Sequence, residues 1–393
     1  MRCKPLNDYF IRNEREAHFA NLADQLAAQF AETAGKYDVE GSFPFEHFEK
    51  MKEAGYLKTT VPKKYGGDEA SLYEMVLMQE RLAKGDGSTA LGVGWHVGMI
   101  LNLRENEDWP EKIYQEFCEK VVNDGEMINS FASERATGSP ARGGRPQTTA
   151  EKTDNGWLIT GRKTFSTLSP ILNYFTVSAG IKDRDEIGRF LVRKDEHVHI
   201  EETWNTMSMR ATGSHDVILD GVEVPDNALI EIEIPGKKTH HQNDQGWMLH
   251  IPACYIGIAH AARDYALKYA MNYRPNSLPG PISELEHIQQ KIGQIEIELK
   301  TARILLYSIA DRWDQHPQER LQLRSELGLA KYVATNAALS IVDQAMRIVG
   351  GASLSRSLPL ERMYRDVRAG IHNPPADDVV IKGLAQSAYS SLK

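Results

Sequence analysis

The sequence predicts an α+β protein in three parts: an N-terminal helical domain (1–125), a middle β-domain of sandwich or barrel type (126–236) and a C-terminal four-helix bundle (237–393). Two observations predict this order. Apolar residues recur at three- and four-residue spacing in the first and last parts, as in amphipathic helices. Between them, short runs rich in β-branched and aromatic residues are separated by Gly, Asp and Asn turns. A chain of 393 residues is long enough for two or three domains, each with its own core.

In the first part, a helix is expected from Glu14, with apolar residues on one face. Further helices are expected over 45–54, 72–83 and 88–104, and an extended segment with a turn over 57–67. The helix over 88–104 contains Gly92, Gly94 and Gly98, and each glycine costs a helix interior about 1 kcal/mol relative to alanine. Close packing against another helix or against a flat ligand would explain them. Trp95 and His96 lie among these glycines, either as core residues or as part of a pocket wall.

Strands are expected over 157–160, 174–179, 189–193, 198–202 and 217–224. From Trp247 onward long apolar stripes predict three helices, the third over 329–348 and ending at Gly350-Gly351. A last helix is expected after Pro374-Pro375, with Asp377 and Asp378 in its first turn, where carboxylates suit the helix dipole. Long helices joined by short loops are typical of an antiparallel bundle.

Composition excludes several classes of function. The net charge of -8 and the lack of a basic run argue against nucleic-acid binding. Cys3, Cys118 and Cys254 are too few and too scattered for a disulfide framework or a zinc site, so no metal is expected. The sequence contains no apolar run of 18 residues, so no membrane span is expected. The first residues contain no apolar signal segment. The expected setting is the reducing cytoplasm.

The stretch from Glu126 to Ala179 carries the strongest functional signal. It contains two hydroxyl-rich segments at strand ends, Ser133-Glu134-Arg135-Ala136-Thr137-Gly138-Ser139 and Gly161-Arg162-Lys163-Thr164-Phe165-Ser166-Thr167. Small hydroxyl residues and free backbone N–H groups beside an aromatic side chain can bind the edge of a flat, hydrogen-bonding ring. Ordinary β-turn chemistry is the alternative explanation.

These segments and three later motifs, in this order, resemble the acyl-CoA dehydrogenase superfamily of flavoproteins over about residues 14–387. The two segments resemble the family's T-E-x-x-A-G-S and G-x-K-x-W-I-T patterns. Met209-Arg210-Ala211-Thr212-Gly213-Ser214, Arg347-Ile348-Val349-Gly350-Gly351 and Tyr364-Arg365-Asp366 resemble its end-of-β-domain, Q-x-x-G-G and R-D patterns.

The resemblance implies an FAD cofactor between the β-domain and the bundle, with its adenine end reaching a neighbouring subunit. The chain is then at least a dimer, commonly a dimer of dimers. Phe165 would stack on the flavin ring, and Thr167 would lie beside its N5 edge. The implied cofactor-binding residues are Phe131, Ser133, Gly138, Ser139, Phe165, Thr167, Arg274, Arg347, Gly350 and Gly351. Two departures stand out: Arg347 replaces the family's glutamine, and Arg274 is followed by Pro275-Asn276-Ser277-Leu278, which breaks the usual R-x-x-F-G pattern.

The resemblance also implies a small-molecule substrate, an acyl-CoA thioester, and an electron-transfer flavoprotein or a flavin reductase as electron partner. The implied substrate-binding residues are Trp95, Ser139, Trp247 and Asn373. The reaction would be α,β-dehydrogenation, in which a carboxylate removes the α-proton while hydride passes to flavin N5.

That carboxylate is missing. Family members place it eight residues after the R-D aspartate, which is Pro374 here, or ten residues before a G-x-A in the first bundle helix, which is Trp247. Asp377 and Asp378 are weak substitutes. His372 lies close to the first position.

Three hypotheses therefore stay open: dehydrogenation with a displaced base, reduced-flavin monooxygenation, and flavin or acyl-thioester binding without catalysis. Some flavin-dependent monooxygenases of this fold lack the glutamate and use histidines in the regions of His372 and His96. In that case the cofactor could be FMN.

Overall fold

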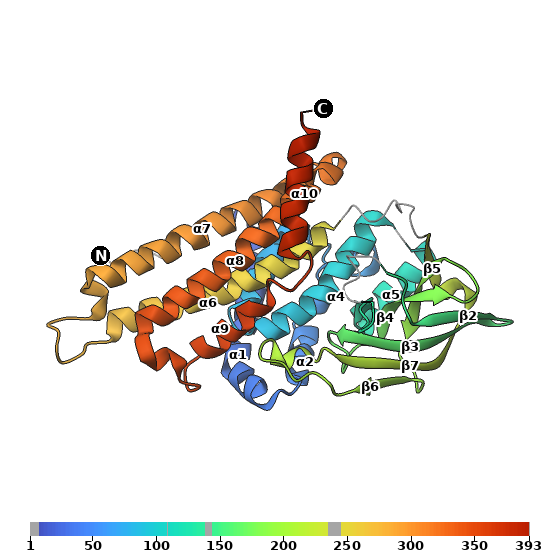
Figure 1. Cartoon of the computed structure of the whole chain (residues 1–393), viewed down its shortest axis with the longest axis horizontal. Coiled ribbons are helices and arrows are strands. Elements are labelled where there is room, and N and C mark those ends of the chain that lie inside the picture. The colour runs from blue at the N-terminus through green and yellow to red at the C-terminus, as the bar shows by residue number, and fades with distance from the viewer. Residues whose placement is uncertain (1–7, 108, 138–143, 235–244, 393) are drawn as a thin grey trace.

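A computed structural model describes residues 8–107, 109–137, 144–234 and 245–392. Its elements follow the predicted order of helices, strands and helices (Figure 1). The α+β prediction with helical first and last parts around a β-domain is confirmed.

The first part holds five helices, α1 (Glu14–Glu40), α2 (Phe45–Glu53), α3 (Leu72–Ala83), α4 (Gly87–Asn106) and α5 (Glu111–Asp124). Side chains in the sequence fix where they begin. Ser71 and Glu74 form a capping box on α3, and the Asp86 carboxylate accepts the N–H groups of Ser88 and Thr89 at the start of α4. The segment after α2 is not extended as expected. It forms two short 3-10 helices, η1 (Tyr56–Lys58) and η2 (Lys63–Tyr65), because backbone bonds such as Thr59 N–H to the Tyr56 carbonyl close tight turns.

The middle part is one mixed sheet in the order β6-β7-β3-β2-β4-β5-β8, with β1 parallel to β4. Its strands are β1 (Ile128–Phe131), β2 (Thr149–Thr153), β3 (Gly156–Ser166), β4 (Tyr174–Ile181), β5 (Ile187–Arg193), β6 (Val198–Glu201), β7 (His215–Val224) and β8 (Leu229–Glu233). The pair β3–β7 is antiparallel and shifts register between Lys163 and Ser166. This irregularity lies at the end of β3 that points toward the helical parts (Figure 1).

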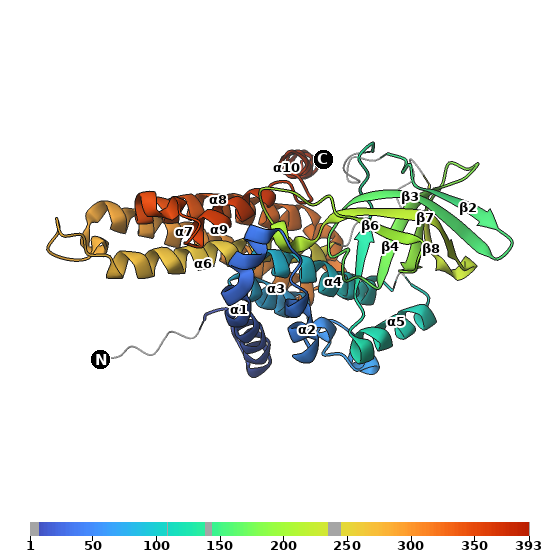
Figure 2. The ribbon, with the colours of Figure 1, turned by 90° about the horizontal axis from the view of Figure 1, so that it is seen from below.

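After the short helix η7 (Gly246–Leu249), the last part contains α6 (His250–Asn272), α7 (Glu286–Gln315), α8 (Arg324–Val349), α9 (Leu360–Ala369) and α10 (Asp377–Ser390). Helices α6, α7 and α8 lie side by side and are much longer than α9 and α10 (Figures 1 and 2). The expected last helix is the 14-residue α10, which packs against α8 and buries Val380. Helix α3 of the first part also packs against α6 and α7.

Helix α4 connects the three parts. It lies between the bundle and the sheet in both views and is buried along most of its length. One hydrophobic core passes through all three parts and includes Phe30, Phe175 and Ile341. Within the described residues, every helix is too short or too polar to span a lipid bilayer.

Candidate functional site

The first hydroxyl-rich segment is fixed to the sheet by a buried ion pair. Lys163 on β3 and Glu134 are 0% and 3% exposed, and their charged atoms lie 2.6 Å apart. Glu134 also accepts the backbone N–H groups of Gln147 and Thr148, and the Lys163 ammonium donates to the Ser178 carbonyl. Burial raises the pKa of the Glu134 carboxyl, but hydrogen bonds from Lys163 and Thr148 outweigh burial and hold that pKa below its usual range. The Lys163–Glu134 ion pair therefore positions the first hydroxyl-rich segment, and both charged groups are used in these contacts.

The end of β3 presents an aromatic ring and a chain of hydroxyls. Phe165 is 68% exposed, its backbone has a left-handed φ of 54°, and its ring lies edge to face with that of Trp204 at 5.8 Å. Two residues on, the Thr167 hydroxyl is 2.8 Å from that of Ser214, which is 2.8 Å from that of Thr212. An open ring face therefore lies next to polar groups.

The loop that carries Thr212 and Ser214 is held from the bundle. Asp366 on α9 is fully buried and accepts the Met209 N–H at 2.7 Å. Its neighbour Arg365 makes a bidentate ion pair with Asp38 on α1 and donates to the Met207 carbonyl. Burial raises the pKa of the Asp366 carboxyl to about 7, against the opposing charge of Arg362. The R-D motif thus joins α1, α9 and this loop.

The residues at this strand end fit a flavin ring. A flat apolar ring system needs a stacking face, which the exposed Phe165 offers. Its heteroatom edge needs hydrogen-bonding partners, which Thr167 and Ser214 can supply. The Ser133 carbonyl accepts the Thr164 N–H, so the first segment lies beside the same strand. We call Ser133, Phe165, Thr167 and Ser214 the flavin seat.

Not every predicted cofactor residue lies there. The Phe131 side chain is buried and stacked on Phe175 at 4.7 Å, inside the sheet's core. Gly138 and Ser139 lie outside the described residues.

The remaining predicted cofactor residues lie at the end of the bundle that is farther from the flavin seat. Arg274 follows α6 and is exposed; Arg347, in the last turn of α8, pairs with Asp343 at 2.6 Å. A methyl group added at Gly350 or Gly351 would meet no atom within 4 Å, so the space before these glycines is open. The ends of α6 and α8 that carry these residues point away from the sheet in both views (Figures 1 and 2). One chain therefore does not bring them to its own flavin seat.

The two candidate catalytic histidines are in opposite environments. His96 on α4 is fully buried: its Nε2 is 3.1 Å from the Leu57 carbonyl, and its Nδ1 accepts the Ile128 N–H at 3.2 Å. Burial lowers the pKa of this imidazole to about 4. His372, after α9, is exposed, and its side chain has no hydrogen-bond or ion-pair partner among the described residues.

The other candidates near His372 are partly engaged. Asn373 accepts a hydrogen bond from the buried Tyr255 hydroxyl at 2.5 Å. Asp377 uses both carboxylate oxygens, one 3.2 Å from the Lys331 ammonium and the other accepting from Asn336. Asp378 is exposed in the first turn of α10, where both aspartates were predicted.

Trp95 and Trp247, predicted to bind substrate, lie in contact. Their half-buried rings meet edge to face at 5.6 Å, and both rings also contact His250, the first residue of α6. Sequence reasoning missed His250, although its position three residues after Trp247 placed both on one helix face. It also missed Ser214, which was part of a recognised motif but carried no assigned role.

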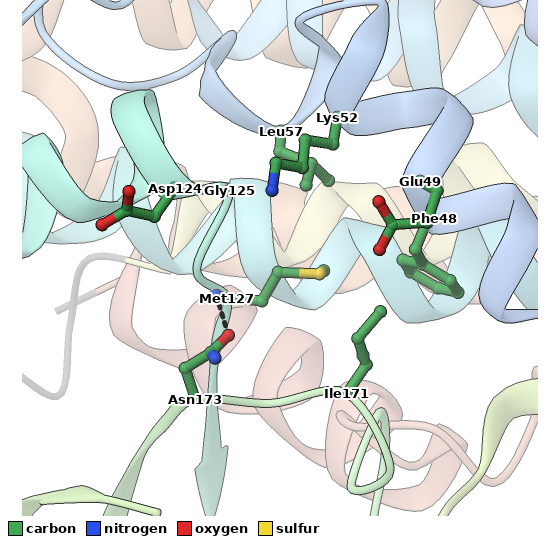
Figure 3. Close-up of a pocket in the computed structure, with 9 residues that line it drawn as sticks. All are labelled: Phe48, Glu49, Lys52, Leu57, Asp124, Gly125, Met127, Ile171 and Asn173. Atoms are coloured by element: carbon green, nitrogen blue, oxygen red, sulfur yellow. Dashed lines mark hydrogen bonds between the residues drawn. The ribbon is translucent and has the colours of Figure 1, made fainter.

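A cleft of about 230 Å³ is lined by none of the flavin-seat residues (Figure 3). Its walls come from α2, the end of α5, the start of β1 and the loop before β4. Asn173 accepts the Met127 N–H at 3.0 Å across one wall, and Glu49, Lys52 and Asp124 bring mixed charges. None of the predicted site residues lines it.

Comparison with known proteins agrees with this architecture. Family models match residues 13–106 (acyl-CoA dehydrogenase, N-terminal domain), 130–222 (middle domain) and 249–370 (C-terminal domain). The "Putative acyl-CoA dehydrogenase YdbM" of Bacillus subtilis (strain 168) is 49% identical over 383 residues, covering 97% of this chain and 99% of the relative.

Two solved structures share the fold. Butyryl-CoA dehydrogenase from Megasphaera elsdenii has a TM-score of 0.85 at 21% identity, covering 98% of this chain and 100% of that one. KijD3 in complex with FMN and a dTDP-linked amino-keto sugar has a TM-score of 0.86 at 24% identity, covering 96% of this chain and 94% of that one. The helical–β–helical fold with a seat for a flat ring defines a flavin-dependent oxidoreductase. The chain belongs to the acyl-CoA dehydrogenase family.

Proposed function

We propose that the chain catalyses α,β-oxidoreduction of an acyl thioester, with an imidazole in place of the usual carboxylate as proton-transfer group. The observation that carries this is that neither base position, Pro374 or Trp247, holds a carboxylate, while His372, two residues before Pro374, is exposed and has no side-chain partner among the described residues. The family membership and the names of YdbM and butyryl-CoA dehydrogenase support the reaction class.

The alternative carboxylate fits this role less well. Both Asp377 oxygens already accept from cationic or amide partners, and the Lys331 ammonium among them is only 2% exposed. A general base needs a free lone pair within hydrogen-bond reach of the proton it removes. Removing Asp377 from this pairing would leave a buried cation without its partner.

The residues of the chain then have separate roles in the reaction. The bound flavin supplies the two-electron acceptor. Phe165 and the Thr167–Ser214 hydroxyls hold and orient the ring system. His372 exchanges the substrate proton, since an exposed imidazole nitrogen can act as a general acid or base when it lies within hydrogen-bond reach of that proton. Asn373, fixed by Tyr255, steadies the loop that carries His372.

The test is anaerobic mixing of the oxidised flavoprotein with butyryl-CoA and 3-phenylpropanoyl-CoA, following the visible flavin absorbance. Bleaching is expected with at least one thioester, and His372→Ala is expected to slow it about 100-fold. Added imidazole should restore part of the rate in that variant. His316→Ala, at an exposed histidine just after α7, is the matched control and should bleach at the wild-type rate. Absence of bleaching with both thioesters would refute the proposal.

Monooxygenation is the second candidate, favoured by the same missing carboxylate. His96 offers it little support, because both ring nitrogens already bind backbone groups. The distinguishing measurement supplies reduced flavin under ¹⁸O₂ with indole or a thioether and looks for the label in the product. Incorporated label would favour this candidate over dehydrogenation.

We propose FAD as the cofactor, with its adenine end bound by a second subunit. Arg274, Arg347 and the Gly350-Gly351 pair lie at the ends of α6 and α8 that point away from the sheet, and the two glycines face open space, as residues serving a neighbouring copy would. FMN lacks the adenine end, so Arg347→Ala should weaken FAD binding several-fold and leave FMN binding unchanged. Equal losses for both flavins would contradict this assignment. An electron-transfer flavoprotein is the proposed electron partner.

A further inference from the structure

His250 is a buried histidine without a hydrogen-bond partner in the described part of the chain. It is the first residue of α6, its side chain is 0% exposed, and neither ring nitrogen has a partner among the described residues. Leaving such a group unsatisfied costs about 1–3 kcal/mol, and buried polar groups are therefore normally paired. The other buried histidines follow this rule: His96 binds two backbone groups, and His47 lies between the hydroxyls of Thr33 and Thr89.

The surroundings of His250 are shaped to hold the ring in place. Its imidazole is stacked on Trp247 at 5.9 Å with an interplanar angle of 15°, and Trp95 meets it edge to face at 4.8 Å. Two glycines of α4 make room: a methyl group at Gly94 would collide with His250 Nδ1, and one at Gly98 would lie 2.9 Å from Trp247. The glycines that weaken α4 thus admit an aromatic cluster of Trp95, Trp247 and His250.

The cluster borders the flavin seat. On α4, Gly92 packs against Leu168, the residue after Thr167, while Gly94 and Gly98 face α6. Trp95 lies between these two faces of the helix, so it points into the angle between the end of β3 and the start of α6. Both indoles are only half-buried there. A substrate held against the flavin seat meets this cluster.

We propose that His250 is a specificity-determining residue that hydrogen-bonds an uncharged polar group on a ring-bearing substrate, whose ring lies against Trp95 and Trp247. The half-buried Trp95 is the ring that turns aside to expose the imidazole.

The chemistry of the cluster defines the ligand. Burial lowers the pKa of His250 to about 3, so its imidazole stays neutral and offers one donor and one acceptor. A hydroxyl or ring N–H satisfies such a group, whereas a charged group would enter an apolar site without a counter-charge. The flanking indoles favour a flat ring over a flexible chain. A hydroxyaryl or indole-like substituent on the substrate meets these requirements.

The inference rests on the proposed function for the position of the substrate, but its test does not. Phenol and toluene have the same shape and differ in the hydroxyl group, and neither needs flavin or a thioester to bind. Their affinities for the flavin-free protein, measured by calorimetry, are expected to differ about 10-fold in favour of phenol, the value of one hydrogen bond to a buried partner. Failure of thioesters to bleach the flavin would leave this result standing, and the reverse also holds.

His250→Phe keeps the ring and removes both nitrogens. It should abolish the preference for phenol and also raise the melting temperature of the ligand-free protein, because unsatisfied polar atoms are replaced by apolar ones. His47→Phe is the matched control: it breaks two hydrogen bonds, so it should lower the melting temperature and keep the preference. A destabilised His250→Phe that still prefers phenol would mean that buried water satisfies His250, and would overturn the proposal. If His250→Phe does not fold, phenol-soaked wild-type crystals decide, since the phenol hydroxyl must lie within hydrogen-bond distance of His250.

Discussion

The junction between the three parts and the flavin seat use polar residues in opposite ways. At the junction, Arg365 is paired with Asp38 and Asp366 with the Met209 N–H, and within the β-domain Lys163 is paired with Glu134 in the same way. At the seat, Phe165 is mostly exposed on a left-handed backbone, and the nearby loop leaves His372 unpartnered within the described residues. Both sets belong to stretches that the sequence comparison singled out as motifs.

The difference separates residues that hold the site from residues that use it. A buried charge is tolerated only when its partners are in place, so paired motif residues fix the geometry. Groups that have no interaction partner in the protein alone gain one when the cofactor or the substrate binds. If this distinction is right, changes at the junction should alter mainly stability, and changes at the seat mainly binding.

The largest effect is expected at the buried ion pair. Lys163→Met leaves the 3%-exposed Glu134 carboxylate without its cation and should cost about 3–5 kcal/mol of unfolding free energy. Chemical denaturation measures this. The double variant Glu134→Gln/Lys163→Met should recover much of the loss, because no isolated charge remains. A loss below about 1 kcal/mol in Lys163→Met would contradict the scaffold role.

Asp366 should make stability depend on pH. Its folded pKa is about 7 and its ordinary value 3.8, so the folded protein binds a proton over a range where the unfolded chain does not. The contribution is complete below pH 4 and is lost as pH rises through 7, at about 1.4 kcal/mol per pH unit between them. Urea unfolding from pH 4 to 8 should show this slope in the wild type relative to Asp366→Asn. Parallel curves for the two proteins would refute it.

Substitution of His96, a predicted catalytic residue, also tests the comparison between residues that support the site and residues that are open to ligands. His96→Phe leaves the Leu57 carbonyl and the Ile128 N–H unpaired in the core and should cost about 2–4 kcal/mol. His372→Phe changes an exposed side chain and should alter stability by less than about 0.5 kcal/mol. Thermal unfolding of both variants checks this. Equal effects would remove the distinction between a supporting and an open histidine.

The smallest effect should have opposite signs for folding and binding. Phe165→Gly relieves a left-handed backbone and should stabilise the flavin-free protein by about 0.5–1 kcal/mol. It also removes the stacking ring, so flavin affinity should fall by about 5–10-fold. Leu168→Gly is the contrast: its φ is 70°, but its side chain is fully buried, so this variant should be destabilised. Unchanged flavin affinity in Phe165→Gly would mean that the ring does not stack on the cofactor.

The sequence by itself determined the order of the parts and the positions of several helices and strands. Apolar periodicity placed α3 at its observed bounds and α10 after Pro374-Pro375, because helix faces and caps are local properties. It failed over 57–62, where turns bonded through the backbone replace the expected extended segment. The last helix of the bundle is shorter than the three before it and packs against α8, and α3 from another part of the chain packs against α6 and α7.

The tertiary structure alone decided which site residues are open and which are engaged. Sequence patterns gave His96 and His372 equal standing, yet one is bonded on both nitrogens by segments 32 and 39 residues away and the other has no partner in the described chain. His250 was recognised only from the structure, in which glycines of α4 leave room for the rings of His250 and Trp247. Residue type and spacing specify local structure and family. Whether a polar atom is satisfied depends on contacts between distant segments, and those exist only in the folded chain.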